Sequence, residues 1–292
     1  MVTAPALADA PSPGVVHDLR EIVHDTWHSR SLIFQLTLRD IRVRYKQALM
    51  GFAWAILSPL LIVAAGVVMR VALLHMAHER FDVGAVAGIV VKGLGWSFVA
   101  GAVGFSTAAL TGNAPLISKV YFPREILPLS VVLASTFDSL IGATALGLFL
   151  PVTGWRPTGA VLWVPVLALV LFVLTLAVGL LVSCANVFFR DVKYLVQLLI
   201  TFGIFFTPVF YEPGALGGRW IPLQMLNPVA PLLEGLRLSV VNGHNLFVPL
   251  TQAGAVIWSP LYLAYSIAWA AGGLLVGAIV FHRAHFRFAE YV

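Results

Sequence analysis

The sequence consists mainly of long apolar runs separated by short polar segments. About 20 apolar residues in a helix are enough to cross the roughly 30 Å hydrocarbon core of a bilayer. Because backbone groups inside lipid must find hydrogen-bond partners within their own segment, each run of about that length predicts a helix. The membrane-spanning helices predicted in this way cover residues 51–74, 83–110, 126–150, 160–188, 194–211 and 256–281.

The stretch 212–255 has a different pattern. It is too apolar for an ordinary loop, yet prolines interrupt it too often for a straight helix. Short helices that dip back into the outer leaflet fit this pattern, and such broken backbone is tolerated at membrane depth only where it is buried in protein or lines a water-filled cavity. The prolines are Pro213, Pro222, Pro228, Pro231 and Pro249.

Residues 30–47 are expected to form an amphipathic helix that lies along the membrane surface, because apolar residues recur at helical spacing among charged ones. The apolar stripe contains Phe34, Leu38, Ile41 and Tyr45. Leu36 and Val43 fall outside that stripe and are candidates for contact with a protein partner. The alternative is a basic anchor that is held only by anionic lipid.

The first 27 residues are Ala/Pro-rich and then polar, without the charged and apolar regions of a signal peptide. We therefore divide the chain into three parts: a flexible cytoplasmic lead-in at 1–27, an amphipathic interface helix at 28–48, and a six-helix transmembrane domain at 49–292.

Composition excludes a water-soluble domain. Of the 292 residues, 60% are hydrophobic and 11% are charged, and the mean hydropathy is +0.92. The net charge of +5 does not indicate nucleic-acid binding, because the basic residues flank apolar runs instead of clustering with aromatic residues.

The positions of Lys and Arg predict the topology, since these residues accumulate on the cytoplasmic side of membrane proteins. An even number of spans places both termini on one side, so we expect a multi-pass inner-membrane protein with both termini in the cytoplasm. The cations assigned to that side are Arg20, Arg30, Arg39, Arg42, Arg44, Lys46, Lys119, Arg124, Arg190, Lys193, Arg283 and Arg287.

No Gly-Lys dipeptide occurs in the sequence, so the chain lacks the phosphate-binding loop that an ATPase of this kind needs. Transport energy would come from an ion gradient or from another subunit. Asp138 alone lies in the middle of a predicted span, where it either relays protons or makes a packing hydrogen bond to a Ser or Thr of a neighbouring helix. We favour the structural role. Arg70 and Lys92 lie nearer to the ends of their spans.

Metal or cofactor binding by this chain is not expected. His75 and His78, followed by Glu79, and the pair His282 and His285 do not complete a zinc-binding His-Glu-x-x-His motif. Cys184 is the one cysteine, and its apolar surroundings indicate a packing role.

Aromatic residues gather in the outer half of the fifth predicted helix: Phe202, Phe205, Phe206, Phe210 and Tyr211. They form either the aromatic belt that is common at membrane interfaces or a stacking surface for sugar rings. The pattern alone does not separate these two interpretations.

Several blocks of the sequence resemble, in the right order, the ABC-2 type permeases that export cell-surface polysaccharides such as O-antigen and teichoic acid. The resemblance extends from about residue 30 to residue 292. Lys92 and Gly95 depart from the family pattern, which has an apolar residue and a proline there. The blocks are Arg44 to Gln47 with Gly51, Trp54 and Pro59; residues 119–128; 186–194; 207–211; Asn227 and Pro228 with Pro231, Glu234, Gly235 and Arg237; and 288–292.

The resemblance implies an all-α membrane protein with six transmembrane helices, an N-terminal amphipathic interface helix and re-entrant outer helices at 212–250. It also implies a homodimer and two copies of a separate nucleotide-binding ATPase subunit, which would hold ATP and Mg. The expected substrate is a polyprenyl-diphosphate-linked glycan, and similarity to actinobacterial members of the family points to galactan.

The family also implies roles for residues. Those expected to contact the ATPase, on 30–47 and on a coupling segment near 113–124, are Arg39, Arg42, Arg44, Lys46, Asn113, Leu116, Lys119, Tyr121 and Arg124. The expected substrate-pathway residues are Trp54, Phe202, Phe205, Phe206, Phe210 and Tyr211, and Asp138 is expected to be structural.

Two other classes remain as alternatives: an ion-coupled carrier, and an integral-membrane enzyme such as a glycosyltransferase or lipid phosphatase. A carrier would need paired ionisable groups near the midplane, and an enzyme would need clustered acidic or histidine groups. The sequence pattern indicates neither.

Overall fold

The computed structural model describes residues 14–46, 53–77, 83–120, 122–153, 155–215, 217–252 and 254–291. Tyr121, His78 and Glu79, which the sequence analysis singles out, lie outside the described residues, as does the side chain of His75.

The chain is an all-α membrane protein, and each predicted span corresponds to a helix. Within the described residues, four stretches are long and apolar enough to cross a membrane, and two shorter apolar stretches, Leu60–Ala72 and Val192–Phe206, lie in the first and fifth of these helices. The helices are α3 (Ala53–Ala77), α4 (Val83–Thr107), α6 (Ile126–Phe149), α7 (Trp163–Phe188), α8 (Val192–Phe206) and α11 (Pro260–Ala284).

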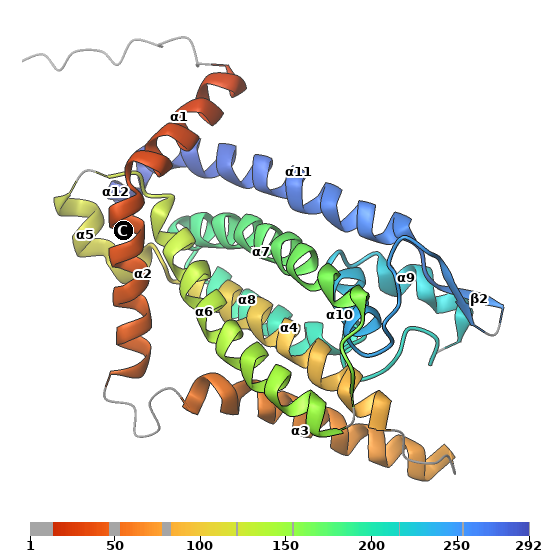
Figure 1. Ribbon diagram of the computed structural model, residues 1–292. Coiled ribbons are helices and arrows are strands. Elements are labelled where there is room, and N and C mark those ends of the chain that lie inside the picture. The colour runs from red at the N-terminus through yellow and green to blue at the C-terminus, as the bar shows by residue number, and fades with distance from the viewer. Residues whose placement is uncertain are drawn as a thin grey trace, which may run out of the picture.

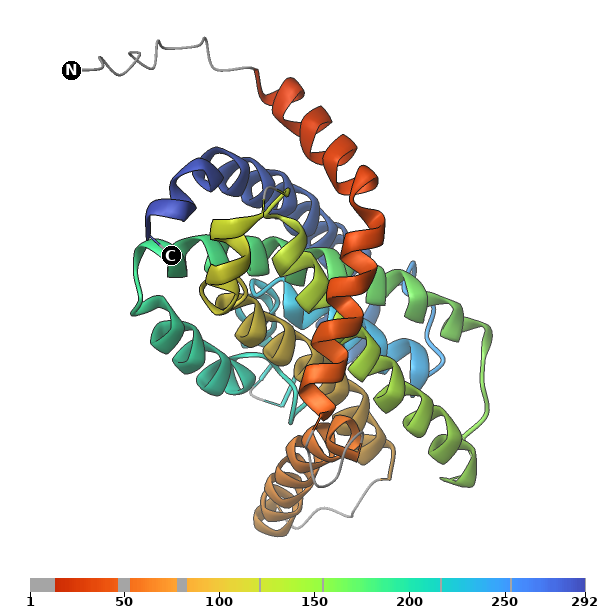
Figure 2. The ribbon, with the colours of Figure 1, turned by 90° about the vertical axis from the view of Figure 1, so that its left-hand side faces the viewer.

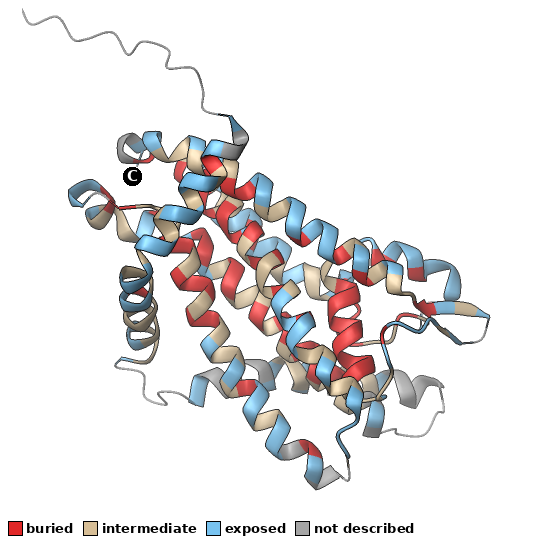
Figure 3. Ribbon diagram, turned by 45° about the horizontal axis from the view of Figure 1, so that its top comes forward, coloured by how far each residue is buried: buried red, intermediate tan, exposed pale blue. Residues whose placement is uncertain are grey.

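Helix α7 lies at the centre of the bundle and packs against α4, α6 and α11 (Figure 1). Its close approach to α11 requires a glycine: a Cβ at Gly277 would lie 3.0 Å from the carbonyl oxygen of Ala177. Buried residues concentrate on the inner faces of the bundle, and many apolar residues on the outer faces are exposed (Figure 3), as expected where lipid or another chain covers them.

Short elements gather at the two ends of the bundle. One end, which we call the α5 end, carries both the first and the last helices of the described chain (Figure 2). The opposite end, which we call the hairpin end, carries a two-stranded antiparallel hairpin. The α5 end contains α1 (Val15–His28), α2 (Arg30–Tyr45), η1 (Thr111–Asn113), α5 (Ala114–Lys119), η5 (His285–Arg287) and α12 (Phe288–Tyr291). Towards and at the hairpin end lie η2 (Leu150–Thr153), η3 (Gly159–Leu162), η4 (Gly218–Trp220), α9 (Ile221–Met225), α10 (Val229–Val240), β1 (Leu250–Gln252) and β2 (Ala255–Trp258).

The fifth predicted span is too long. Helix α8 ends at Phe206, and Thr207 is extended, with φ −96° and ψ 130°. The reason is Pro208, because the residue before a proline is pushed out of the helical region. Fifteen residues extend only about 22 Å at 1.5 Å per residue, so α8 is shorter than the hydrocarbon core.

Two expectations about the N-terminal region are wrong. Residues 15–27 of the expected lead-in belong to α1, which packs on α11, where Arg283 Nε donates to the buried Asp18 carboxylate at 3.0 Å. On α2, the buried residue is Leu36, and Phe34 of the predicted stripe is 64% exposed. Leu36 is therefore not available to a partner, whereas Val43 is exposed.

Candidate functional site

Asp138, in the middle of α6, receives two side chains from the end of α2. Arg44 Nη1 donates to Oδ2 and the Tyr45 hydroxyl donates to Oδ1, both at 2.5 Å. Arg44 Nη2 also donates to the Ser135 hydroxyl at 3.1 Å. Burial and the hydrogen bond to Asp138 raise the pKa of the Tyr45 phenol well above its usual range. Tyr45 therefore remains a proton donor in this cluster, whose main partner is an arginine and not the Ser or Thr that we expected.

The face of α2 that packs on α6 explains this geometry. Leu36, Asp40 and Arg44 recur every four residues, so they lie on one side of the helix. The Ser130 hydroxyl donates to Asp40 Oδ2 at 3.0 Å, and Arg39 Nη2 lies 2.8 Å from Asp40 Oδ1. Leu36 in an apolar cluster with Ile126 and Leu127, together with the polar contacts of Asp40 and Arg44, therefore holds α2 across α6.

A cavity of about 370 Å³ adjoins the Arg44–Asp138 pair. Trp54 at the start of α3 lines it, and the Arg44 guanidinium lies 4.1 Å from the ring centroid of Phe105. This volume is within the range of small-molecule sites. The predicted pathway residue Trp54 is thus beside a cavity, although far along the chain from the aromatic residues of α8.

The coupling segment predicted near 113–124 contains the short helix α5. Asn113 Nδ2 donates to the Ala109 carbonyl at 2.8 Å, and Ile117 anchors α5 in an apolar cluster with Leu110. Leu116 packs against the same cluster, and Lys119 is exposed.

The cations predicted to face an ATPase divide into two groups. Arg42, Lys46 and Lys119 are exposed, and Arg39 is 40% exposed beside Asp40. Arg44 and Arg124 instead point inward, because Arg44 bonds Asp138 and Arg124 bonds the His285 carbonyl. For Arg44 the prediction of an ATPase contact is therefore wrong, since its guanidinium is committed to α6.

A second cluster of charges is buried towards the hairpin end. The side chains of Lys92 on α4 and Glu234 on α10 are 1% and 0% exposed, and Lys92 Nζ lies 3.6 Å from Glu234 Oε2. Arg237 Nε donates to Glu234 Oε1 at 3.0 Å, and Arg237 Nη1 lies 3.5 Å from Glu212. Lys92 also donates to the Tyr211 carbonyl at 2.6 Å.

The sequence analysis missed this cluster. It found no paired ionisable groups inside the spans, yet Glu234 lies within ion-pair distance of two cations. The i, i+3 spacing of Glu234 and Arg237 in an apolar segment was an available signal. The cavity among these groups is only about 10 Å³, so the cluster is closed to solutes.

The predicted aromatic group is divided. Phe202, Phe205 and Phe206 are exposed on α8, and Phe206 is 77% exposed. Phe210 is 5% exposed and its ring packs tightly against Gly66. Tyr211 is half-buried and its hydroxyl donates to the Phe205 carbonyl at 3.0 Å. With Leu195 and Leu199, Phe202 and Phe206 form an exposed apolar ridge along α8.

Comparison with known proteins gives a family and several relatives. Residues 31–241 match the model of the family described as ABC-2 type transporter. Two proteins of Klebsiella pneumoniae, each named O-antigen export system permease protein RfbA, are 27% and 26% identical to the chain over 260 and 262 residues. Both alignments cover 89% of this chain and 94% of the relative. A protein of the same name from Myxococcus xanthus is 28% identical over 250 residues, which is 84% of this chain and 94% of the relative.

We expect Asp138→Asn and Arg44→Gln to lower the melting temperature individually, because each leaves a charge without its partner. In the double variant the losses should not add, with a coupling energy of roughly 0.5–3 kcal/mol. Thermal unfolding of the purified wild type and variants, followed by tryptophan fluorescence, measures these melting temperatures. Arg42→Gln, on the exposed side of the same helix, is the control and should be nearly silent. Strictly additive losses would contradict a direct pair.

We expect Glu234→Gln to destabilise the protein by about 3–5 kcal/mol, because it leaves two buried cations without their shared counter-charge. Lys92→Met should cost less, since Arg237 still pairs with Glu234. Denaturant unfolding of each variant measures its free energy of unfolding, and the exposed Arg219→Gln is the control. A larger loss in Lys92→Met than in Glu234→Gln would show that Glu234 is not the centre of the cluster.

Proposed function

The chain belongs to the ABC-2 type transporter family, and we propose that it is the membrane subunit of an ATP-driven exporter of a lipid-linked cell-surface polysaccharide. The observation that carries this proposal is the likeness to O-antigen export permeases over 94% of their length. Galactan carried on a polyprenyl diphosphate is the substrate we propose.

A separate ATPase subunit would supply the energy. The sequence has no Gly-Lys for a phosphate-binding loop. The α5 end offers a surface for such a partner, because Lys119 on α5 and Arg42 and Lys46 at the end of α2 are exposed there. With that end in the cytoplasm, both termini are cytoplasmic, since α1 and α12 lie at the same end (Figure 1).

The arrangement of the α5 end supports a route for coupling. Helix α5 is followed within a few residues by α6, and α6 holds α2 through Asp138 and Ser130. Closure of two ATPases against α5 would therefore move α6 and α2 together. A second copy of the chain would complete the path, and we propose that the apolar ridge of α8 faces it.

An ion-coupled carrier is the second candidate, and the buried Lys92–Glu234–Arg237 cluster is the observation that favours it. Family membership and the tight packing of the cluster favour the exporter. A cavity of about 10 Å³ among these groups has room for about one water molecule, so it offers no site for a hydrated ion. The third alternative, a membrane enzyme, would need clustered acidic or histidine groups, and Glu125, His282 and His285 form one such cluster at the α5 end. Family membership favours the exporter over this alternative as well.

Reconstituted with its ATPase, the chain should move lipid-linked glycan when ATP is supplied, whereas the chain alone should hydrolyse no ATP. A cysteine at Ser118 on α5 should crosslink to the partner, and one at Arg219, towards the hairpin end, should not. Cys184 is buried and does not compete for the reagent. Crosslinks formed only by Asp191→Cys, in the α7–α8 turn, would contradict docking at α5. Hydrolysis by the isolated chain would contradict the division of labour.

Phe206→Ala and Phe210→Ala should have different effects. Loss of the exposed Phe206 should lower export of glycan and leave the melting temperature near wild type, because this ring has little contact with its own chain. Loss of the buried Phe210 should cost about 3–5 kcal/mol of stability. Leu169→Ala, on the exposed side of α7, is the matched control. Wild-type export by Phe206→Ala would remove this residue from the path.

A further inference from the structure

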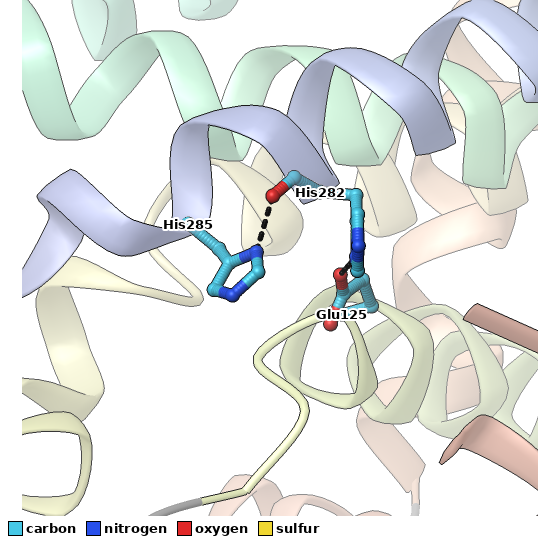
Figure 4. A group of neighbouring side chains, drawn as sticks. All are labelled: Glu125, His282 and His285. Atoms are coloured by element: carbon cyan, nitrogen blue, oxygen red, sulfur yellow. Dashed lines mark hydrogen bonds and ion pairs between the residues drawn. The ribbon is translucent and has the colours of Figure 1, made fainter. Parts of the chain in front are cut away.

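Three potential metal ligands from distant parts of the chain meet at the α5 end. Glu125 opens α6, and His282 and His285 lie one turn apart where α11 runs into η5 (Figure 4). One ligand atom from each residue lies within 4.8 Å of the others. His282 Nδ1 is 3.0 Å from Glu125 Oε1, close to the separation of about 3.3 Å between two ligands 2.0 Å from a tetrahedral Zn²⁺.

The other nitrogen of each histidine faces an oxygen, which accepts a hydrogen bond from His285 and lies at ion-pair distance from His282. His282 Nε2 lies 3.7 Å from Glu21 Oε2 on α1, and His285 Nδ1 lies against the His282 carbonyl oxygen. A carbonyl only accepts, so His285 Nδ1 carries the proton and the lone pair is on Nε2. Metal-binding histidines are typically oriented in this way, with the second ring nitrogen donating to a carboxylate or backbone carbonyl.

The charge of the surroundings suits a divalent cation. A cavity of about 140 Å³ adjoins the group and is also lined by Glu21, Asp25 and Arg124. With both imidazoles neutral, the three carboxylates and one guanidinium leave two negative charges. The Glu125 carboxylate and His282 are largely buried, at 11% and 12% exposed, and a buried carboxylate attracts a cation more strongly than one in water. Glu21 and Asp25 are 47% and 43% exposed and contribute less.

We propose that Glu125, His282 and His285 bind one divalent transition-metal ion, of the Zn²⁺ class, with Glu21 as the partner that orients His282. Two imidazoles and one carboxylate suit zinc and leave a fourth position open to water. The ion would join the segment after α5 to the end of α11 and, through Glu21, to α1. The sequence argues against a metal here because His282 and His285 complete no His-Glu-x-x-His motif. The carboxylate that joins them is Glu125, 157 residues before His282.

The test is a metal titration of the full chain in detergent, purified with a tag that contains no histidine. Co²⁺ is the probe, because a protein nitrogen and oxygen site gives it visible absorption bands, and Zn²⁺ should displace it. We expect one ion per chain. Glu21→Gln should weaken binding about 10–100-fold, the range for loss of a partner of a ligand, and the His282→Gln, His285→Gln double variant should lose the bands.

The matched control is His24→Gln with His28→Gln. The rings of this pair on α1 are stacked with centroids 5.4 Å apart, whereas those of His282 and His285 are tilted with centroids 4.9 Å apart. The carboxylate within reach of His24 is Asp25, whose side chain is 43% exposed. The control variant should bind Co²⁺ as wild type does. Zn²⁺ should also raise the melting temperature of wild type and of the control, but not of the double variant. Equal binding by the His282/His285 variant, or no stoichiometric binding by wild type, would overturn the proposal whether or not the chain exports glycan.

Discussion

The ion pair between Arg44 and Asp138 determines how α2 can lie on the bundle. A carboxylate in the middle of an apolar helix is costly without a counter-charge, because few water molecules reach it. Its two oxygens take their strongest partners from α2, so α2 must cross α6 at one position. The contacts of Leu36 and Asp40 follow from that position, since both share a face of α2 with Arg44.

The need of a buried charge for a counter-charge also shapes the hairpin end of the molecule. Helix α10 is short and almost wholly buried, and it brings Glu234 and Arg237 into the interior. Lys92 supplies a second cation from α4 and also holds the Tyr211 carbonyl, which lies in the irregular backbone after α8. Lys92 is thus part of the network in this chain. The irregular backbone after α8 is thus held in place by buried charged side chains, which would find no other partners in lipid.

The sequence predicts the membrane helices well because the bilayer imposes a length and an apolar composition on each of them. It fails where a contact between distant residues decides the outcome. The end of α8 depends on Thr207 and Pro208 and was open to local reasoning, whereas the docking of α1 on α11 involves the hydrogen bond that Arg283 donates to Asp18. The partners of Asp138 could not be inferred either, since Arg44 is 94 residues away and appeared to belong to a basic surface. Phe206 and Phe210 share a spacing typical of one helix face, and only the break at Thr207 separates them.

The connections at the α5 end bear on how force from a partner would spread. Helix α5 leads into α6, and α6 is joined to α2 by direct polar contacts along two turns. The segment between α5 and α6 contains Arg124 and Glu125. The Glu125 carboxylate accepts a hydrogen bond from His282 of α11, and Arg124 donates to the His285 carbonyl. A displacement of α5 therefore has two routes into the bundle, one through α2 and one through α11. The second route rests on the hydrogen bonds of Glu125 and Arg124 to the end of α11, beside a cavity of about 140 Å³. An ion held by Glu125, His282 and His285 would stiffen it, and occupancy would then set how far α11 follows α6.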